Sequence, residues 1–254
     1  MIALSSVVQA NDILIVESDL DDSYMRKALE DSQLAVGKGA DKGDAEKFYF
    51  LFENVFRGSM EEIKKRQSIY LRYVVEAHAN SRGSFFLDAG CGRCEFLTLL
   101  KEHGISAKGV DTNRLAAELG KKMNVDVISR DAFEYLASLE DNSLIGFSMF
   151  QVIEHLDFRR VDGILKTSLR KISPNGIIII ESVNPYCPTA LGKFYLDPTH
   201  VRPYASDLIK LTLEWHGFEK VKIIYSSRLP KRLYFAEAAR SYQDYAVVGT
   251  KAGS

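Results

Sequence analysis

The sequence has little cysteine, no excess of either charge and no long apolar run. Its 254 residues include three cysteines, an odd and sparse set that fits a reducing cytoplasm rather than a disulfide framework. The 33 Lys and Arg residues balance 34 Asp and Glu residues, which argues against nucleic acid as the main partner. No apolar run approaches the roughly 20 residues that span a bilayer, and Met1–Ala10 makes a poor signal peptide. We therefore expect a cytoplasmic protein without a transmembrane segment.

Short apolar strands alternate with helical patterns through the middle of the chain. The predicted strands are Phe85–Leu87, Ala107–Val110, Val125–Ser129, Leu144–Met149 and Ile177–Glu181. The predicted helices are Glu95–His103, Arg114–Met123, Ala132–Leu139, Arg160–Lys171 and Ala205–His216. This alternation predicts an α/β fold with a doubly wound, mostly parallel sheet and helices on both faces. Glu219–Tyr225 and Asp244–Thr250, joined without a crossover helix, predict an antiparallel hairpin at the edge.

The first 80 residues are expected to form an extension to this sheet. Ile13–Val16 is a short apolar run, a strand or a docking segment. Asp19–Gly43 has the composition of a poorly ordered lead-in, or of a lid over a ligand. From residue 45 to residue 79 the apolar spacing is helical, and Ser59 with Glu62 predicts a capping box at a helix start.

A glycine-spaced turn follows the first strand of the alternation, in the stretch Asp88-Ala89-Gly90-Cys91-Gly92. Glycines at such a turn let a bare main chain approach a ligand beside a helix N-terminus. Cys91 and Cys94 have C-x-x-C spacing. A redox dithiol is one interpretation of this spacing. We favour the other interpretation, in which both cysteines are small residues that fill a crowded turn.

Acidic residues also end the next two strands. Asp111, followed by Thr112, is placed to accept hydrogen bonds from ribose hydroxyls. Asp131, followed by Ala132, is placed to meet an adenine edge. The alternative for Asp111 is that it caps the following helix. Taken together, the three strand ends predict a nucleoside site.

These motifs, with the turn at Pro174-Asn175-Gly176, resemble class I S-adenosylmethionine-dependent methyltransferases over residues 81 to 251. The resemblance implies a Rossmann-like fold of seven strands with an antiparallel last strand, and S-adenosylmethionine as cofactor. It implies methionine contacts along 88–92 and ribose and adenine contacts at 111–112 and 131–132. Gln151, after the fourth strand, is a further predicted cofactor contact. A nicotinamide enzyme is the alternative from the glycine turn alone. Cys94 stands where many members have a third glycine.

Two further stretches, Phe52–Gln67 and Phe194–Tyr204, are similar to bacterial methyltransferases of O-antigen and other surface-polysaccharide synthesis. Some of those proteins cap the growing glycan and stop its elongation. The resemblance implies methylation of a sugar hydroxyl or a sugar phosphate, with association to a polysaccharide-synthesis complex and an oligomer as further possibilities. On this basis we divide the chain into an extension and helical cap at 1–80 and a methyltransferase domain at 81–254.

An irregular insert at residues 184–204, with four prolines, is predicted to hold the acceptor site. His200 is the expected general base, oriented by Asp197, and His155 is the rival base. A self-capping turn with an internally bonded His200 is the alternative. The predicted substrate-binding residues are Arg57, Arg66, Tyr195, Arg202 and Tyr204. Arg57 and Arg202 are expected to clamp an anion, and the two tyrosines to stack on a sugar.

No metal is expected, because no His and carboxylate set appears in the sequence at ligand spacing. Two other functions remain open at this point. One is a methyltransferase acting on a small molecule or a lipid. The other is a non-catalytic binding protein that retains the methyl-donor fold.

Overall fold

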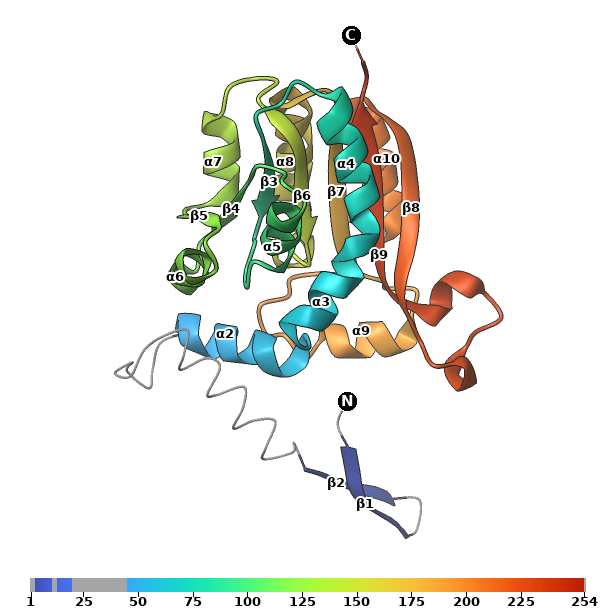
Figure 1. Cartoon of the computed structure of the whole chain (residues 1–254). Helices are drawn as coiled ribbons and strands as arrows, with labels where there is room; N and C mark the ends of the chain where they lie inside the picture. The colour runs from blue at the N-terminus through green and yellow to red at the C-terminus, as the bar shows by residue number, and fades with distance from the viewer. Residues whose placement is uncertain (1–2, 11–12, 20–44, 254) are drawn as a thin grey trace. The chain divides into compact units, whose positions relative to one another are not determined.

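The computed structural model describes residues 3–10, 13–19 and 45–253 of the chain, and side chains from residue 48 onward (Figure 1). Contacts divide the chain into two compact units, Met1–Ile63 and Lys64–Ser254, each described by itself below. The sequence placed a boundary after residue 80 instead, and a separate domain at 1–80 stays a prediction. The lead-in or lid predicted for Asp19–Gly43 lies outside the described residues, except for Asp19.

The first unit contains a hairpin and a helix. β1 (Ala3–Ala10) and β2 (Ile13–Asp19) pair antiparallel, which confirms a strand over the predicted run at 13–16. α2 (Ala45–Phe56) follows, and α3 (Met60–Gln67) begins at the end of the unit. The predicted capping box is present at the start of α3. The Ser59 N–H donates to Glu62 Oε2 at 3.2 Å, and the Glu62 N–H donates to Ser59 Oγ at 3.3 Å.

The second unit carries the sheet and its helices. Its strands are β3 (Phe85–Ala89), β4 (Ala107–Asp111), β5 (Asp126–Ser129), β6 (Leu144–Phe150), β7 (Ile172–Val183), β8 (Phe218–Arg228) and β9 (Tyr242–Lys251). Its α-helices are α4 (Leu71–Asn80), α5 (Glu95–Glu102), α6 (Arg114–Met123), α7 (Ala132–Ser138), α8 (Phe158–Lys171), α9 (Pro188–Phe194) and α10 (Ser206–His216). Short 3₁₀ turns lie at Ser68–Tyr70, Ile153–His155, Lys231–Leu233 and Ala238–Ser241.

The seven strands form one sheet in the order β5-β4-β3-β6-β7-β9-β8. The first five are parallel, whereas β9 pairs antiparallel with both β7 and β8. This arrangement confirms the predicted doubly wound sheet with an antiparallel edge. At the expected turn, Pro174-Asn175-Gly176, the pairing of β7 with β6 is interrupted: β7 advances from Ile172 to Ile177 while β6 advances from Leu144 to Gly146, and Asn175 has φ +65°.

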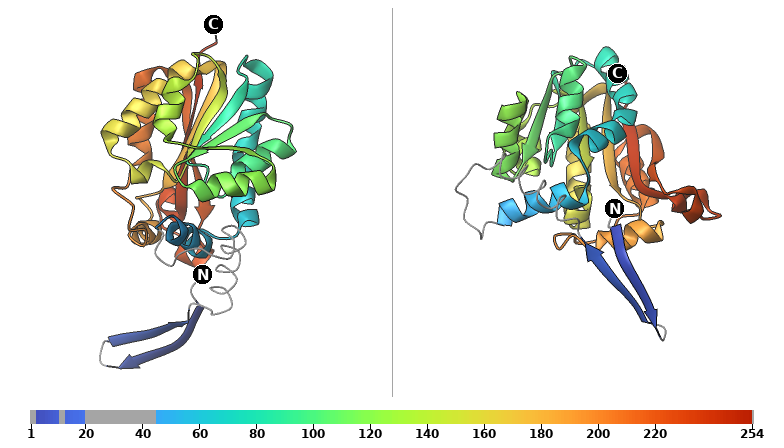
Figure 2. Two further views of the ribbon diagram at one scale, coloured as in Figure 1. Left: turned by 90° about the vertical axis from the view of Figure 1, so that its left-hand side faces the viewer. Right: turned by 60° about the horizontal axis from the view of Figure 1, so that its bottom comes forward.

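Helices cover both faces of the sheet (Figure 2). α7, α8 and α10 pack on one face and α4 and α5 on the other. β6 is buried along its whole length, as expected for a central strand with a helix layer on each side. Among the residues that the structure describes, no helix combines the length and apolar character needed to cross a membrane.

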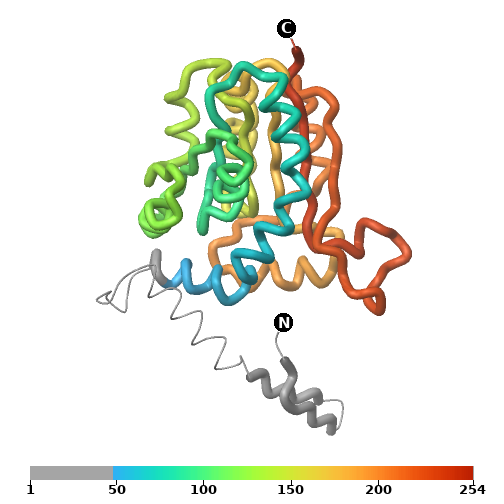
Figure 3. Tube along the Cα trace, viewed as in Figure 1, coloured from blue at the N-terminus to red at the C-terminus, as the bar shows by residue number. Residues whose placement is uncertain are grey.

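The insert after β7 is partly helical. Figure 3 follows the chain from β7 into α9, which lies across the end of the sheet where β7 finishes, and back to α10. The carboxyl ends of β3, β4, β6 and β7 meet at this same edge, because these strands are parallel neighbours. In open α/β sheets this edge is where ligands bind.

Candidate functional site: a methyl-donor loop and a histidine cluster

The glycine turn after β3 has a backbone conformation that favours glycine. Gly90 has φ +70° and Gly92 has φ +44°, conformations that glycine adopts without steric cost. A Cβ on Gly90 would lie 2.4 Å from Val152 Cγ2, so any side chain at this position requires Val152 to shift. The loop therefore presents bare main chain at the carboxyl edge of the sheet.

Cys91 and Cys94 fill the underside of this loop. All three cysteines of the chain are free and buried. A hydrogen bond with Cys94, together with burial, raises the pKa of the Cys91 thiol, which disfavours the thiolate that redox chemistry needs. Cys94 has φ +67° at the start of α5, a left-handed conformation in which glycine is favoured. This geometry agrees with the comparison of Cys94 to a glycine position in related sequences.

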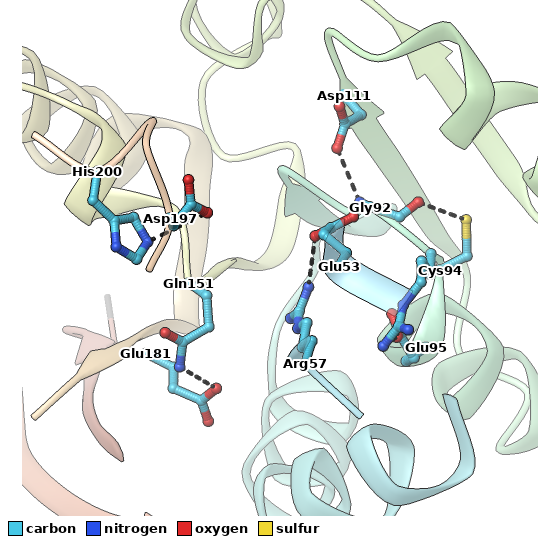
Figure 4. Close-up of polar contacts among 11 residues, drawn as sticks. Glu53, Arg57, Gly92, Cys94, Glu95, Asp111, Gln151, Glu181, Asp197 and His200 are labelled. Atoms are coloured by element: carbon cyan, nitrogen blue, oxygen red, sulfur yellow. Dashed lines mark hydrogen bonds and ion pairs between the residues drawn. The ribbon is translucent and has the colours of Figure 1, made fainter. Parts of the chain in front are cut away.

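Asp111 at the end of β4 bonds into the glycine loop. Its Oδ2 accepts from the Gly92 N–H at 2.9 Å, and its Oδ1 accepts from the Asn113 N–H at 2.8 Å (Figure 4). The alternative role, capping α6, belongs to Asn113, whose side chain accepts from the Leu115 N–H. Thr112, between Asp111 and Asn113, is exposed.

The Asp88 side chain is buried near the carboxyl end of β3 rather than exposed to solvent. It is 3% exposed, and its Oδ1 accepts a 2.6 Å hydrogen bond from the Ser148 hydroxyl of β6. A buried carboxylate needs such partners because an unpaired charge is costly in a low-dielectric interior. Asp88 thereby ties β3 to β6 directly beneath the glycine turn.

Asp131 is engaged in local structure. It is the N-cap of α7, accepting from the N–H groups of Phe133 and Glu134, and it forms an ion pair with Arg160. Burial tends to raise the pKa of Asp131, but the Glu134 N–H and the Arg160 charge outweigh it and hold the pKa below its usual value. The following Ala132 is the first residue of α7. The structure therefore gives Asp131 the capping role, and its predicted adenine contact stays a prediction.

Gln151 joins a polar network at the ends of the central strands. It has φ +58°, and its Nε2 donates to Glu181 Oε1 at 3.3 Å and to Asp244 Oδ1 at 3.4 Å (Figure 4). The buried Tyr70 hydroxyl donates to Glu181 Oε2 at 2.6 Å. Gln151 thus connects β6 with β7 and β9 at the site edge, and its predicted contact with the cofactor remains untested.

Backbone hydrogen bonds join the insert to the segment that follows β6. The Glu154 carbonyl accepts from the N–H groups of Val201, at 2.8 Å, and Arg202, at 3.3 Å. The Tyr204 hydroxyl donates to the Leu156 carbonyl at 2.8 Å. On one segment these bonds lie on either side of His155, and on the other they follow directly after His200, and so they bring the two imidazoles together.

The two histidines meet in a cluster with Asp197 and Thr199. Their ring centroids lie 4.6 Å apart, and His200 also stacks on Phe194. Thr199 Oγ1 lies 2.6 Å from Asp197 Oδ1 and 2.9 Å from His155 Nδ1. His200 Nδ1 lies 2.6 Å from the Phe194 carbonyl oxygen, and its Nε2 lies 3.7 Å from Asp197 Oδ2. We call these four residues, His155, Asp197, Thr199 and His200, the histidine cluster.

Asp197 is built to stay ionised in this cluster. Burial tends to raise the pKa of its carboxyl, but hydrogen bonds from the Thr199 hydroxyl and N–H outweigh it and lower the pKa. Asp197 contacts both imidazoles. Its Oδ2 lies 3.7 Å from His200 Nε2, and it reaches His155 through Thr199, so its expected role in orienting His200 stays a prediction.

The predicted acceptor-binding residues fall into three groups. Arg57 belongs to the first unit, where its Nη1 lies 3.3 Å from Glu53 Oε1 (Figure 4). Arg66, Tyr195 and Arg202 are exposed. Tyr204 is fully buried with its hydroxyl bonded to Leu156, so its ring is a core group and cannot stack on a sugar face in this structure.

Sequence reasoning missed three side chains that shape the site: Ser148, Asn113 and Thr199. Asn113 carried a usable signal, since asparagine immediately before a helical run is a preferred N-cap. Ser148 and Thr199 act through contacts with residues outside their own strand or turn. The sequence also predicted no metal site. The fold, however, brings ligand atoms of His155, Asp197 and His200 within 4.8 Å of one another.

Comparisons with known proteins identify the family. Residues 63–225 match the family described as the methyltransferase domain. A crystal structure of an S-adenosylmethionine-dependent methyltransferase from Archaeoglobus fulgidus is 35% identical, covers 80% of this chain and 100% of its own, and superposes with a TM-score of 0.72. No curated protein matches the sequence.

Two more distant structures share the fold. One, from Thermotoga maritima, is titled a possible histamine N-methyltransferase; it is 20% identical over 81% of this chain and 97% of its own, with a TM-score of 0.57. The other is an O-methyltransferase family protein from Burkholderia thailandensis, 13% identical over 98% of this chain and 80% of its own, with a TM-score of 0.58.

The chain belongs to the methyltransferase-domain family and is a class I S-adenosylmethionine-dependent methyltransferase. The donor-side residues fit this cofactor. The turn at Gly90 leaves no room for a Cβ, and the Asp111 carboxylate stands at the neighbouring strand end where a ribose is bound in such folds.

Proposed function

We propose that this methyltransferase acts on a sugar hydroxyl, or on a sugar phosphate, at the end of a surface polysaccharide such as O-antigen, and that the methyl group stops chain growth. The observation that most supports the proposal is the histidine cluster. The insert brings His200 and Asp197 against His155 at the edge of the sheet where the glycine turn after β3 also lies. We further propose a cytoplasmic location beside the polysaccharide-synthesis machinery, in keeping with three buried free cysteines.

Methyl transfer to a hydroxyl requires that the oxygen lose its proton as it bonds to carbon. Bound S-adenosylmethionine supplies an activated methyl group on a positively charged sulfur, which leaves as a neutral thioether. The protein's task is to hold the acceptor oxygen in line with that methyl group and to accept the proton. Imidazole is suited to accepting a proton near neutral pH.

Either imidazole of the cluster can take the proton. His200 is the expected base, and the Phe194 carbonyl fixes its orientation through Nδ1. His155 is the rival, because the chain of contacts from Asp197 through Thr199 orients it in the same way. Replacing each by asparagine separates them, since the base should be the residue whose loss lowers turnover more.

The surface beside the cluster suits a sugar or a sugar phosphate. Arg202 is exposed next to the turn that carries His200 and can approach an anion, and the exposed ring of Tyr195 offers a flat apolar face. Arg66, which is also exposed, is a further proposed acceptor contact. The same groups can bind a hydroxyl-rich glycan end without a phosphate.

Incubation with methyl-labelled donor and a panel of surface glycans tests this function, with the products read by mass spectrometry. The panel should pair each glycan with its phosphorylated form, so that hydroxyl and phosphate methylation are separated by fragment mass. An Asp111→Ala variant, expected to lose donor binding, controls for background transfer. Labelling of lipid or quinone acceptors, with none on any glycan, would favour the alternative substrate class.

A further inference from the structure

We propose that His155, Asp197 and His200 form a binding site for a divalent transition-metal ion such as Zn²⁺. Each offers one ligand atom, and these atoms lie within 4.8 Å of one another. Two imidazoles and one carboxylate are a ligand set that Zn²⁺ and related ions accept, whereas Mg²⁺ and Ca²⁺ prefer oxygen ligands. The catalytic role of the ion rests on the proposed function, but its binding does not.

The hydrogen bonds fix which nitrogen of His155 carries the lone pair. Thr199 has one hydroxyl hydrogen, and the 2.6 Å contact with the acceptor-only Asp197 Oδ1 uses it. The 2.9 Å contact between Thr199 Oγ1 and His155 Nδ1 therefore requires the imidazole to donate. Neutral His155 then has its proton on Nδ1 and its lone pair on Nε2.

The same assignment follows for His200 from a different partner. Its Nδ1 lies 2.6 Å from the Phe194 carbonyl oxygen, which can only accept, so Nδ1 carries the proton and Nε2 the lone pair. His200 Nε2 faces Asp197 Oδ2 at 3.7 Å. Metal-binding histidines characteristically donate their other N–H to a carbonyl or a similar oxygen, which is the arrangement of both residues here.

Asp197 is prepared as the anionic ligand. Its Oδ1 accepts from both the N–H and the hydroxyl of Thr199, at 2.8 and 2.6 Å, so the carboxylate is held in one orientation with Oδ2 toward His200. Metal–ligand bonds of about 2.0 to 2.2 Å place neighbouring ligand atoms about 3 to 3.5 Å apart. Since the ligand atoms lie within 4.8 Å of one another, binding requires the longest pair to contract by no more than about 1.3 to 1.8 Å.

Three protein ligands leave a coordination position open, as in catalytic rather than structural zinc sites. An acceptor hydroxyl in that position would have its pKa lowered by the ion. Its proton then leaves to solvent, and its oxygen bonds to the methyl carbon as the carbon–sulfur bond breaks. An imidazole bound to the ion cannot also serve as the base, so the proton-accepting role proposed above for His200 or His155 applies to the protein without the ion.

Metal titration of the full-length, chelator-treated protein tests the site without donor or acceptor. We expect one Co²⁺ per chain, with visible absorption and no thiolate charge-transfer band, and competition by Zn²⁺. His155→Asn and His200→Asn should each weaken binding at least about 100-fold, and Thr199→Val about 10- to 100-fold through its partners alone. His78→Asn, at an exposed histidine on α4, is the matched control and should bind like wild type.

Binding by His155→Asn and His200→Asn equal to that of the control would overturn the proposal, as would a thiolate band that assigns the ion to the cysteines. Far-ultraviolet circular dichroism and donor affinity verify that each variant is folded. Glycan methylation without metal binding would refute the metal site and keep the proposed function. Metal binding without glycan methylation would support the metal site and refute the proposed function.

Discussion

The two halves of the site are built in different ways. The donor side comes from one short stretch, β3 to β4, and is set by backbone conformation: positive φ at Gly90 and Gly92, with Asp111 bonded to the loop. The acceptor side that we propose, the histidine cluster, comes from two distant segments joined by the Glu154 carbonyl and by the side chain of Thr199. A change on the donor side should therefore impair folding and cofactor binding together, whereas a change on the acceptor side should affect turnover alone.

The largest effect is expected from Gly90→Val. The new side chain would require φ +70° of a β-branched residue and would bring its Cβ to 2.4 Å from Val152 Cγ2. We expect loss of measurable donor binding by calorimetry and a fall of about 2 to 4 kcal/mol in unfolding free energy by urea titration.

A pair of milder variants separates the clash from the backbone strain. Gly90→Ala alone has both the clash with Val152 and the backbone strain. Gly90→Ala combined with Val152→Ala has only the backbone strain, which costs about 1 to 2 kcal/mol. Because Val152 packs against the core, Val152→Ala alone is measured as well, and the double variant should be more stable than the sum of the two single changes predicts. If Gly90→Ala already binds the donor as wild type does, the loop is not set by its backbone and the contrast between the two halves fails.

The second effect is on the acceptor side. His155→Asn or His200→Asn should lower turnover about 10²- to 10⁴-fold at the residue that acts on the proton, with donor affinity unchanged. Turnover is measured with labelled donor on the responsive glycan and affinity by calorimetry. His216→Asn is a useful control, because that imidazole bonds Asp162 of α8 and belongs to a different part of the fold. Weakened donor binding in the cluster variants would show that the two sides of the site do not act independently.

The third effect tests the link between Asp111 and the loop. Asp111→Asn keeps the shape of the side chain but turns one acceptor oxygen into a donor, which opposes the N–H of Gly92 or of Asn113. We expect about a 10- to 100-fold weaker donor affinity, since one charge-assisted bond contributes about 1.5 to 3 kcal/mol. Unchanged affinity would show that the carboxylate is not needed on the donor side.

The same contrast explains what the sequence could predict. The donor side could be predicted from the sequence because its signals are local: a strand, glycines and an acid at each strand end. The parallel sheet followed from the β/α alternation, and the antiparallel edge from the missing crossover helix. Asp131 shows the limit, because an acid at a strand end serves equally well as a helix N-cap.

The acceptor side was only half accessible. His155, Asp197 and His200 were singled out from their loops, but their contact depends on how the insert bonds to Glu154. Exposure is likewise a tertiary property. Tyr195 and Tyr204 lie in one short stretch, yet the first is 74% exposed and the second fully buried. No local pattern separates two such tyrosines.

The smallest effect concerns the polar network at the ends of the central strands, outside both halves. Burial, and then the charge of Glu181, raise the pKa of Tyr70 far above its ordinary value, so the folded protein keeps this proton in alkaline solution. Below about pH 10 both folded and unfolded states are protonated and the stabilisation is fully present. Above about pH 10 the unfolded tyrosine ionises, and stability falls by about 1.4 kcal/mol per pH unit for this group.

Tyr70→Phe should remove that component. In urea unfolding above about pH 10, the unfolding free energy of the variant should fall less steeply than that of wild type, by about 1.4 kcal/mol per pH unit, with no difference in slope below about pH 9. The similarly raised pKa of Tyr245 is common to both proteins and cancels in the difference. The variant should also be less stable at neutral pH by about 1 to 3 kcal/mol, because Glu181 loses a 2.6 Å hydrogen bond. Parallel curves would mean that Tyr70 already shares its proton with solvent and that the network is open rather than buried.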